Sequence, residues 1–421
     1  SLILTVRSNT FSPSFTLGWN LAEEDFLKGS AFDELMVSAS GSILNTDMGI
    51  DYYMYKGGYD MEGSSWGWYD GGSLKTSRSL RGANEDLTFL KRKELSANIR
   101  ASLWKKMITA DASFFVNSME GAIISSGNLF PSYFDYSDTQ TFLPYINYNN
   151  DRRMGFDFSL NYNTRFGEVD FSAGINGTYY ATKATKRDDS NYENVYQYRQ
   201  GKAISSIWGY ECLGFFNNEA EIAGAPSQTA LGGGIPKPGD LRYKDQNGDK
   251  VIDDYDKVAI GYSTVLPEIM YGFSIGLGYK NVSLKADFQG VANYTLVRNM
   301  SSMYRPLVGN KNVSQHYLEN RWTPENTNAR YPRLTTKQND NNFRESSIWA
   351  ENGNFLKLRN VELAYTLPKS WVNKIRLSNI NLFARGMNLF SFDHVKDMDP
   401  EQMYATYPSF RSYNIGLTLD F

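Results

Sequence analysis

A run of oxygen-bearing side chains with calcium-loop spacing is the clearest chemical signal in the sequence. Residues 245–256, DQNGDKVIDDYD, place side-chain oxygens at positions 1, 3, 5, 9 and 12, with a backbone carbonyl available at position 7. This spacing is typical of an EF-hand-like or dockerin-like loop, which surrounds Ca²⁺ with roughly six to eight oxygens. The predicted metal ligands are Asp245, Asn247, Asp249, Val251 (through its carbonyl), Asp253 and Asp256.

Two positions of this segment depart from the usual calcium loop. Lys250 stands where glycine is usual, and Asp256 replaces the usual bidentate glutamate. A dockerin-like loop tolerates the second change. The alternative is a solvated acidic turn built on Asn247-Gly248. If a metal binds, we expect it to stiffen a long loop rather than to take part in a reaction.

An aromatic segment is the second candidate site. Residues 51–72 carry several tyrosines and tryptophans among glycines. Flat aromatic faces can stack on sugar rings, and glycine lets a loop approach a ligand closely. The predicted substrate-binding residues are Trp66, Trp68 and Tyr69. Aromatic packing within the loop, or against a partner protein, is the simpler interpretation.

The sequence offers little for enzymatic chemistry. The two histidines, His316 and His394, fall in predicted loops without metal-ligand spacing. Cys212 is the single cysteine, which excludes an internal disulfide, and its surroundings favour a small apolar structural residue. The formal net charge of -3 gives no reason to expect nucleic acid as a partner. We therefore predict a protein that is not an enzyme.

Hydrophobic residues recur with a period of two over much of the chain. Between residues 154 and 162, for example, Met, Phe, Phe, Leu and Tyr alternate with Gly, Asp, Ser and Asn. Such runs have one apolar and one polar face, and about ten residues of this kind cross a bilayer at a tilt. We predict about twelve strands, near 1–7, 12–21, 34–44, 93–105, 108–118, 154–166, 169–182, 268–279, 282–298, 354–367, 379–391 and 409–421.

The connections between these strands alternate in length. Tight turns are predicted at 105–106, 167–168 and 280–281, and long loops at 45–92, 119–153, 183–267 and 299–353. Sorting of short turns to one end and long loops to the other is typical of outer-membrane barrels. The turns and both chain ends are then expected on the periplasmic side and the loops outside the cell. The last strand alternates up to a terminal Phe421, which is similar to the signal that barrel-assembly machinery recognises.

From about residue 200 onward the chain resembles the SusC/RagA family of TonB-dependent outer-membrane transporters. The resemblance is carried by segments in a fixed order: Gly209-Tyr210, Gly214-Phe215-Phe216, 237–243 (KPGDLRY), 245–256, Ile260-Gly261, 267–273, 321–324 (RWTP), 331–333 (YPR), 355–361 (FLKLRNV), 382–390 and the final strand. The first part matches more loosely, chiefly from Phe11 to Trp19 with Glu23-Glu24.

The resemblance implies a fold and a function. Residues 1–421 would be the C-terminal portion of a TonB-dependent transporter barrel, about 12 strands of a probable 22, with two open sheet edges and with the N-terminal plug domain outside this sequence. It would import a glycan or an oligopeptide captured with a SusD-like surface lipoprotein, energised through TonB, across the outer membrane of a Gram-negative bacterium.

Two other function classes stay open at this point. One is a passive or adhesive barrel whose long loops bind a surface partner. The other is a soluble β-sheet protein that binds carbohydrate. Neither the substrate nor the residues of a transport path can be named from the sequence.

Overall fold

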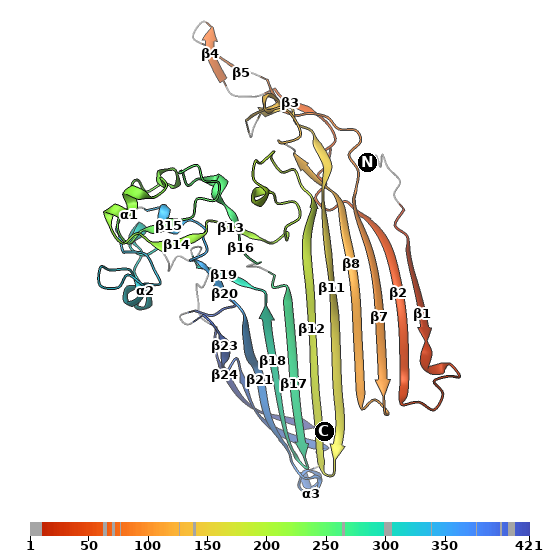
Figure 1. The fold of residues 1–421 in the computed structure, drawn as a ribbon. Helices are drawn as coiled ribbons and strands as arrows, with labels where there is room; N and C mark the ends of the chain where they lie inside the picture. The colour runs from red at the N-terminus through yellow and green to blue at the C-terminus, as the bar shows by residue number, and fades with distance from the viewer. Residues whose placement is uncertain are drawn as a thin grey trace.

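A single curved antiparallel sheet dominates the fold (Figure 1). The structure, a computed structural model, describes residues 11–61, 65–69, 72–75, 77–125, 127–137, 140–262, 266–298, 305–337, 339–375, 377–395, 398–402 and 409–421. The sheet pairs its strands in chain order: β1 (Ser14–Asn20), β2 (Phe32–Thr46), β7 (Leu90–Leu103), β8 (Ile108–Ser125), β11 (Tyr145–Phe166), β12 (Val169–Lys186), β17 (Ile269–Tyr279), β18 (Val282–Ala292), β21 (Phe355–Thr366), β22 (Asn379–Met387) and β24 (Ser412–Asp420), with β23 (Ser391–Asp393) beside β21.

The predicted order of strands is confirmed from β1 to β24. The segment 1–7 lies outside the described residues. Within the described part of the chain, β1 pairs only with β2 and β24 only with β22. Among the described residues the sheet therefore has two unpaired edges, and it has the form of part of a barrel wall (Figure 1).

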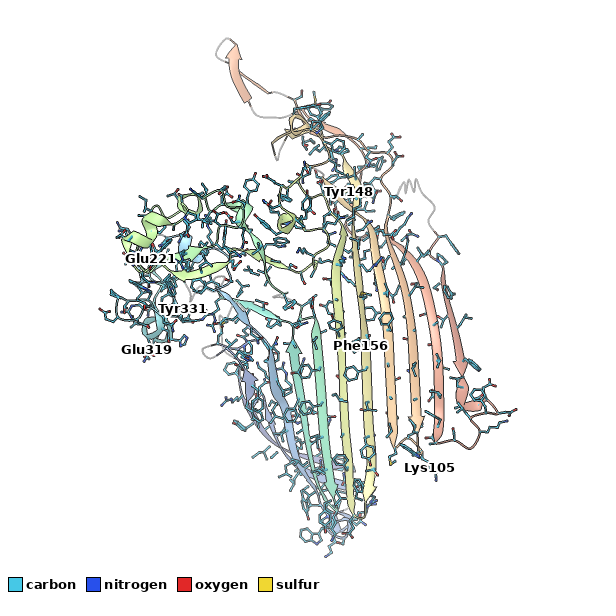
Figure 2. The ribbon with its side chains drawn as sticks, viewed as in Figure 1. Lys105, Tyr148, Phe156, Glu221, Glu319 and Tyr331 are labelled. Atoms are coloured by element: carbon cyan, nitrogen blue, oxygen red, sulfur yellow. The ribbon has the colours of Figure 1, made fainter. Side chains whose placement is uncertain are left out.

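The two ends of the sheet differ as the connection lengths predict. Tight turns lie at one end, the turn end, where residues 104–106 and Lys280 all adopt positive φ. Helix α3 (Lys369–Val372) and the C-terminus lie at the same end (Figure 1). The long connections gather at the opposite, loop end. Lys105 marks the turn end and Tyr148 the loop end (Figure 2).

Five strands clearly exceed the predicted length of about ten residues: β2 has 15, β7 has 14, and β8, β11 and β12 are the longest. β8 has 18 residues, β11 has 22 and β12 has 18. Their extra residues lie at the loop end, where the apolar face becomes polar. Met154 pairs with Val116 on this face, but the next pair toward the loop end is Arg152 with Ser118. The extensions therefore continue the ladder beyond the apolar band, which is why apolar alternation does not reveal them.

The sheet has one apolar and one polar face. On the apolar face, Phe156 lies opposite Phe114 on one side and Tyr179 on the other. Directly opposed residues of antiparallel strands share a face, so the register joins these side chains into a continuous band. Asp157, the next residue of β11, lies opposite Ser113 on the polar face. An apolar face toward lipid and a polar face toward the barrel interior is the expected arrangement.

The loop end carries the remaining elements. They are β3 (Gly58–Asp60), β4 (Ser65–Tyr69), β5 (Gly72–Lys75), β6 (Arg78–Arg81), β9 (Asp135–Ser137), β10 (Gln140–Thr141), β13 (Ile207–Gly209), β14 (Cys212–Phe215), α1 (Glu219–Gly224), β15 (Leu241–Tyr243), β16 (Val258–Gly261), β19 (Thr295–Val297), α2 (Gln315–Asn320) and β20 (Ala350–Asn352). In the part of the chain that the structure describes, no helix has the length and apolar character needed to cross a membrane.

Candidate functional site

Two long loops that are far apart in sequence pack together as one lobe at the loop end. We call residues 207–262 and 305–353 the lobe; Glu221, Glu319 and Tyr331 mark it in Figure 2. Its core is aromatic, with the Tyr331 ring stacked on Tyr317 at a centroid distance of 4.6 Å and on Trp349 at 6.1 Å. Both loops contribute buried residues to this core: Tyr210, Phe215, Leu231, Leu241, Tyr243, Ile252, Tyr317, Trp322, Tyr331, Phe343 and Trp349.

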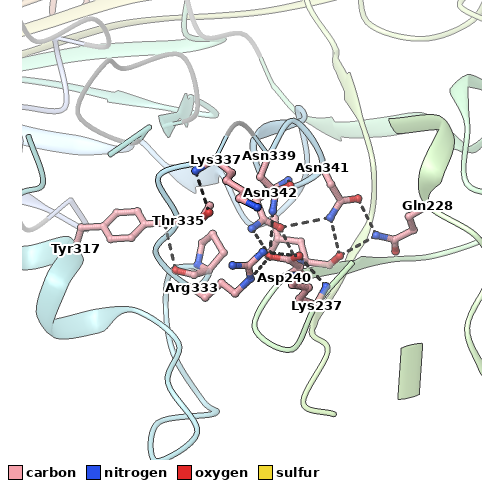
Figure 3. A network of polar contacts seen from close by, with 12 residues as sticks. Gln228, Lys237, Asp240, Tyr317, Arg333, Thr335, Lys337, Asn339, Asn341 and Asn342 are labelled. Atoms are coloured by element: carbon pink, nitrogen blue, oxygen red, sulfur yellow. Dashed lines mark hydrogen bonds and ion pairs between the residues drawn. The ribbon is translucent and has the colours of Figure 1, made fainter. Parts of the chain in front are cut away.

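A buried polar network centred on Asp240 ties the two halves of the lobe together (Figure 3). The Asp240 carboxylate accepts hydrogen bonds from the Lys237 backbone N–H at 2.8 Å, from Asn339 Nδ2 at 3.1 Å and from Asn342 Nδ2 at 2.8 Å. It also pairs with Arg333, whose Nε lies 2.7 Å from Asp240 Oδ1. The side chain of Asp240 is only 3% exposed. A buried carboxylate is tolerated because each oxygen has donors around it.

Amide side chains extend this network to β15. Gln228 Nε2 donates to the Leu241 carbonyl at 2.9 Å and to Asn341 Oδ1 at 2.8 Å. The Tyr243 N–H in turn donates to Gln228 Oε1 at 2.9 Å. These contacts satisfy the Leu241 C=O and Tyr243 N–H groups of β15, which its short ladder with β14 does not pair.

Close packing explains the glycine of the segment 237–243. Gly239 has φ +88°, and a Cβ there would lie 2.4 Å from the Trp322 ring. A side chain at this position would therefore meet both backbone strain and a clash. The residues of this segment that carry the family resemblance build the scaffold of the lobe.

The predicted calcium segment closes on itself through hydrogen bonds from its backbone N–H groups to its own carboxylates. Asp245 accepts from the N–H groups of Gly248 and Lys250 at 2.6 and 2.9 Å. Asp256 is fully buried and accepts from Gln246 and Asp253 at 2.7 and 2.9 Å. Burial raises the pKa of the Asp256 carboxyl. The donor atoms fit calcium chemically, but among the described residues no group of three acidic, His or Cys side chains gathers as a metal site. Calcium binding stays a prediction.

The predicted substrate residues lie in the hairpin that projects furthest from the sheet (Figure 1). Trp66, Trp68 and Tyr69 belong to β4, which pairs with β5, but their side chains lie outside what the structure describes. Nearby, the Tyr52 and Tyr53 rings meet edge to face at 4.9 Å, and Lys56 Nζ lies 4.5 Å from the Tyr53 ring centroid. Stacking on a sugar therefore stays a prediction for β4, whereas Tyr52, Tyr53 and Tyr55 make ring contacts with one another.

A charged cluster stands on the polar face of β21. Lys357, 6% exposed, pairs with Asp399 and, at 2.7 Å, with Glu401. Arg359 pairs with Glu401 and donates to Gln289 Oε1 at 2.8 Å. Burial opposes ionisation of both carboxyls. Lys357, with hydrogen bonds from Ser409 and the Glu401 N–H, outweighs it at Asp399, and Arg359 with Lys357 outweighs it at Glu401, so the pKa of each carboxyl lies below its ordinary value. The cluster fixes residues 398–402 against the inner wall.

The sequence contained one local sign of this cluster. Lys357 and Arg359 are two residues apart in a predicted strand, a spacing that favours one face of the sheet. Their partners could not be identified, because Asp399 and Glu401 come from a different loop.

Comparison with known proteins agrees with this fold. A TonB-dependent receptor of Formosa agariphila is 25% identical over 98% of the chain, and the TonB-dependent receptor SusC of Bacteroides thetaiotaomicron is 22% identical over 99% of it. The solved structure of the RagAB peptide transporter aligns with 97% of the chain at a TM-score of 0.68 and 20% identity. The chain is SusC/RagA-like. No family model matches it.

The SusC/RagA-like chain is shorter than these relatives. It spans 42% of the length of the Formosa agariphila receptor, 40% of SusC and 43% of the aligned RagAB chain. The structural likeness confirms the antiparallel transmembrane barrel wall predicted from the sequence. The named relatives are receptors and transporters.

Proposed function

We propose that the SusC/RagA-like chain belongs to an active outer-membrane importer of the SusC type. The observation that carries this proposal is a barrel wall with an apolar outer band and a polar inner face, topped by the packed lobe, in a chain whose sequence relatives are TonB-dependent receptors. The turn end would face the periplasm and the lobe the outside of a Gram-negative cell.

The imported molecule would be a glycan or an oligopeptide captured together with a SusD-like lipoprotein, with TonB supplying the energy. The tryptophans of β4 favour a glycan, because indole faces stack on sugar rings. The likeness to the RagAB peptide transporter supports an oligopeptide as the alternative substrate. The alternative is a passive or adhesive barrel that binds a surface partner through its loops.

Uptake by living cells tests this proposal. The full-length gene is deleted from its native bacterium, and uptake of fluorescent oligosaccharides and oligopeptides is measured with and without complementation. An importer restores uptake of one class, and loss of TonB abolishes that uptake. Uptake that is unchanged by the deletion would refute the importer, and uptake that persists without TonB would favour the passive barrel. Purification of the full-length protein from outer membranes should bring down a SusD-like lipoprotein in comparable amount.

Orientation is tested separately. Cysteine introduced at Glu221 in the lobe should react with an impermeant maleimide on intact cells, whereas cysteine introduced at Lys105 in the turn should react only after lysis. The opposite labelling pattern would invert the proposed topology.

The tryptophans of β4 provide the test of the glycan interpretation. Replacement of Trp66 and Trp68 by alanine in the full-length protein should weaken uptake of a glycan if their rings stack on it. Unchanged uptake, at an unchanged amount of protein in the membrane, would leave packing as their role.

A structural calcium ion in residues 245–256 is part of the proposal. Calcium would crosslink the oxygens of this loop, so its addition to the purified full-length protein should slow proteolysis there, and Asp249→Asn should reduce this protection. Equal cleavage with calcium and with a chelator would leave the loop as an acidic turn closed by its own N–H groups.

A further inference from the structure

An arginine-lined cavity in the lobe is not explained by the scaffold. It has a volume of about 510 Å³ and lies between β14, β15 and residues 327–330. Arg242 and Arg330 both line it, and among the described residues of its lining none is acidic. The volume lies within the range of small-ligand sites, roughly 300 to 1,000 Å³.

Arg242 reaches the cavity because of the alternation of β15. Leu241 and Tyr243 face the buried core, so Arg242 between them points to the opposite side of the strand. Its partner in the β14 register is Gly214, which has φ +109° and no neighbouring atom within 4 Å of an added Cβ. The glycine leaves open space beside the guanidinium.

The Nε atom of Arg242 marks the unpartnered edge of this guanidinium in the described part of the chain. This atom is buried and has no hydrogen-bond partner within that part of the chain. A buried N–H without an acceptor costs stability, and in a native protein it points to a missing water, ion or ligand. A permanent positive charge makes an anionic acceptor the better complement.

The surroundings of Arg242 favour an anion. Arg330 adds a second guanidinium, whose Nε and Nη2 donate to Glu351 and whose Nη1 donates to the Ile348 carbonyl at 2.8 Å. Glu351 is shared with Arg298, so the two arginines together keep a net positive charge beside the cavity. The Asn217 amide oxygen accepts from Trp322 Nε1 at 3.4 Å, which leaves its NH₂ group to donate. Burial raises the pKa of the Cys212 thiol to about 11, so the thiol on the cavity wall is uncharged at neutral pH.

We propose that this cavity binds an oxyanion group, a carboxylate or a sulfate, carried by the molecule that the protein imports. Arg242 and Arg330 donate to its oxygens, and the remaining volume holds the saccharide or amino-acid residue that bears it. This assignment rests on the proposed importer function and deepens it, because it makes the substrate an anionic one.

Direct binding to the purified full-length protein tests the proposal by calorimetry. Three ligand pairs differ only in the anion: oligogalacturonate and its methyl ester, a sulfated oligosaccharide and its desulfated form, and a tripeptide acid and its amide. We expect one charged member to bind at least about tenfold more tightly than its neutral twin, with weaker binding at higher salt. The pair that shows the preference identifies the source of the anion.

Variants of the cavity show whether Arg242 causes the preference for the charged ligand over its neutral twin. Arg242→Gln should lower affinity for the charged ligand about tenfold or more, and Arg242→Lys should retain part of it. Arg199→Gln, an exposed arginine outside the cavity, should change nothing. Equal binding within all three pairs, or an unchanged preference in Arg242→Gln, would overturn the assignment. Because binding is measured without transport, it can fail while TonB-dependent uptake persists, which separates this inference from the importer proposal.

Discussion

Removal of the charge of Asp240 should open the lobe without unfolding the barrel wall. In Asp240→Asn, one carboxylate oxygen becomes an NH₂ group. If that group replaces Oδ2, it faces the Lys237 N–H and Arg333 Nη2, which both donate to Oδ2 in the wild type. The Lys237 N–H and Arg333 Nη2 then face the NH₂ group of the new asparagine, which cannot accept their hydrogen bonds. Two hydrogen bonds are therefore lost, and Arg333 loses its counterion.

The cost follows from these contacts. Hydrogen bonds to a charged group contribute roughly 1.5–3 kcal/mol each. Removal of one partner of a fully buried ion pair costs about 3–5 kcal/mol, but the Arg333 side chain is 25% exposed and can recruit water. We therefore expect a loss of about 3 kcal/mol in the local stability of the lobe.

Hydrogen exchange of the full-length protein in detergent measures this loss. The Leu241 and Tyr243 N–H groups donate to Asn342 Oδ1 and Gln228 Oε1, both at 2.9 Å, so they report on the network. A loss of about 3 kcal/mol should speed their exchange roughly hundredfold, while amides of β11 and β12 stay protected. Glu219→Gln in exposed α1 is the matched control. Unchanged protection of residues 241–243 in Asp240→Asn would refute the reasoning.

Three further predictions concern other parts of the chain. The carboxyl pKa values of Asp399 and Glu401 are lowered in the folded protein, so the stability from their pairing with β21 is present above their ordinary values of 3.8 and 4.5 and is lost as the pH falls through the lowered values. The protection of amides in 398–402, measured against the intrinsic exchange rate at each pH, should therefore fall on acidification through this range, and this fall should be much smaller in Lys357→Gln. Gly239→Ala should destabilise the lobe by roughly 2–4 kcal/mol, because the added methyl group clashes with Trp322. Gly234→Ala, at a residue with positive φ but open space around it, should cost about 1 kcal/mol. The rate of proteolysis within the lobe should therefore rise more in Gly239→Ala than in Gly234→Ala. Leu160→Arg on the apolar face should cost about 2–4 kcal/mol in urea unfolding from lipid, and Ser159→Arg on the polar face markedly less; equal losses would contradict the assignment of faces.

The barrel wall could be predicted from the sequence because lipid imposes a strict period of two. Phe156 and Leu160 had to face one way and Asp157 and Ser159 the other, whatever their partners. For the same reason the predicted strands fell short at the loop end: β8 and β12 continue beyond their predicted ends, and β11 begins before its predicted start. Beyond Met154, residues 149–153 of β11 are polar on both faces, so the alternation of apolar and polar residues that marks the lipid face ends there.

The lobe could not be predicted, because its contacts join residues without periodicity. Gln228 and Asn341 are 113 residues apart and lie in irregular segments, so neither spacing nor alternation links them. The motif around Asp240 was visible only as a resemblance, which identified a family but gave the residues no structural role. That role became clear from the donors around Asp240 and from the space that Gly239 leaves to Trp322.

β15 connects the scaffold of the lobe to its candidate binding site. Leu241 and Tyr243 hold the strand in the core, and this fixes the direction in which Arg242 leaves it. Loss of anion binding in Asp240→Asn would therefore not identify the ligand contact, since β15 itself would shift. Loss of binding in Arg242→Gln, with the amides of 241–243 still protected, would identify it. The neighbouring positions 240 and 242 thus separate a defect of the fold from a defect of recognition.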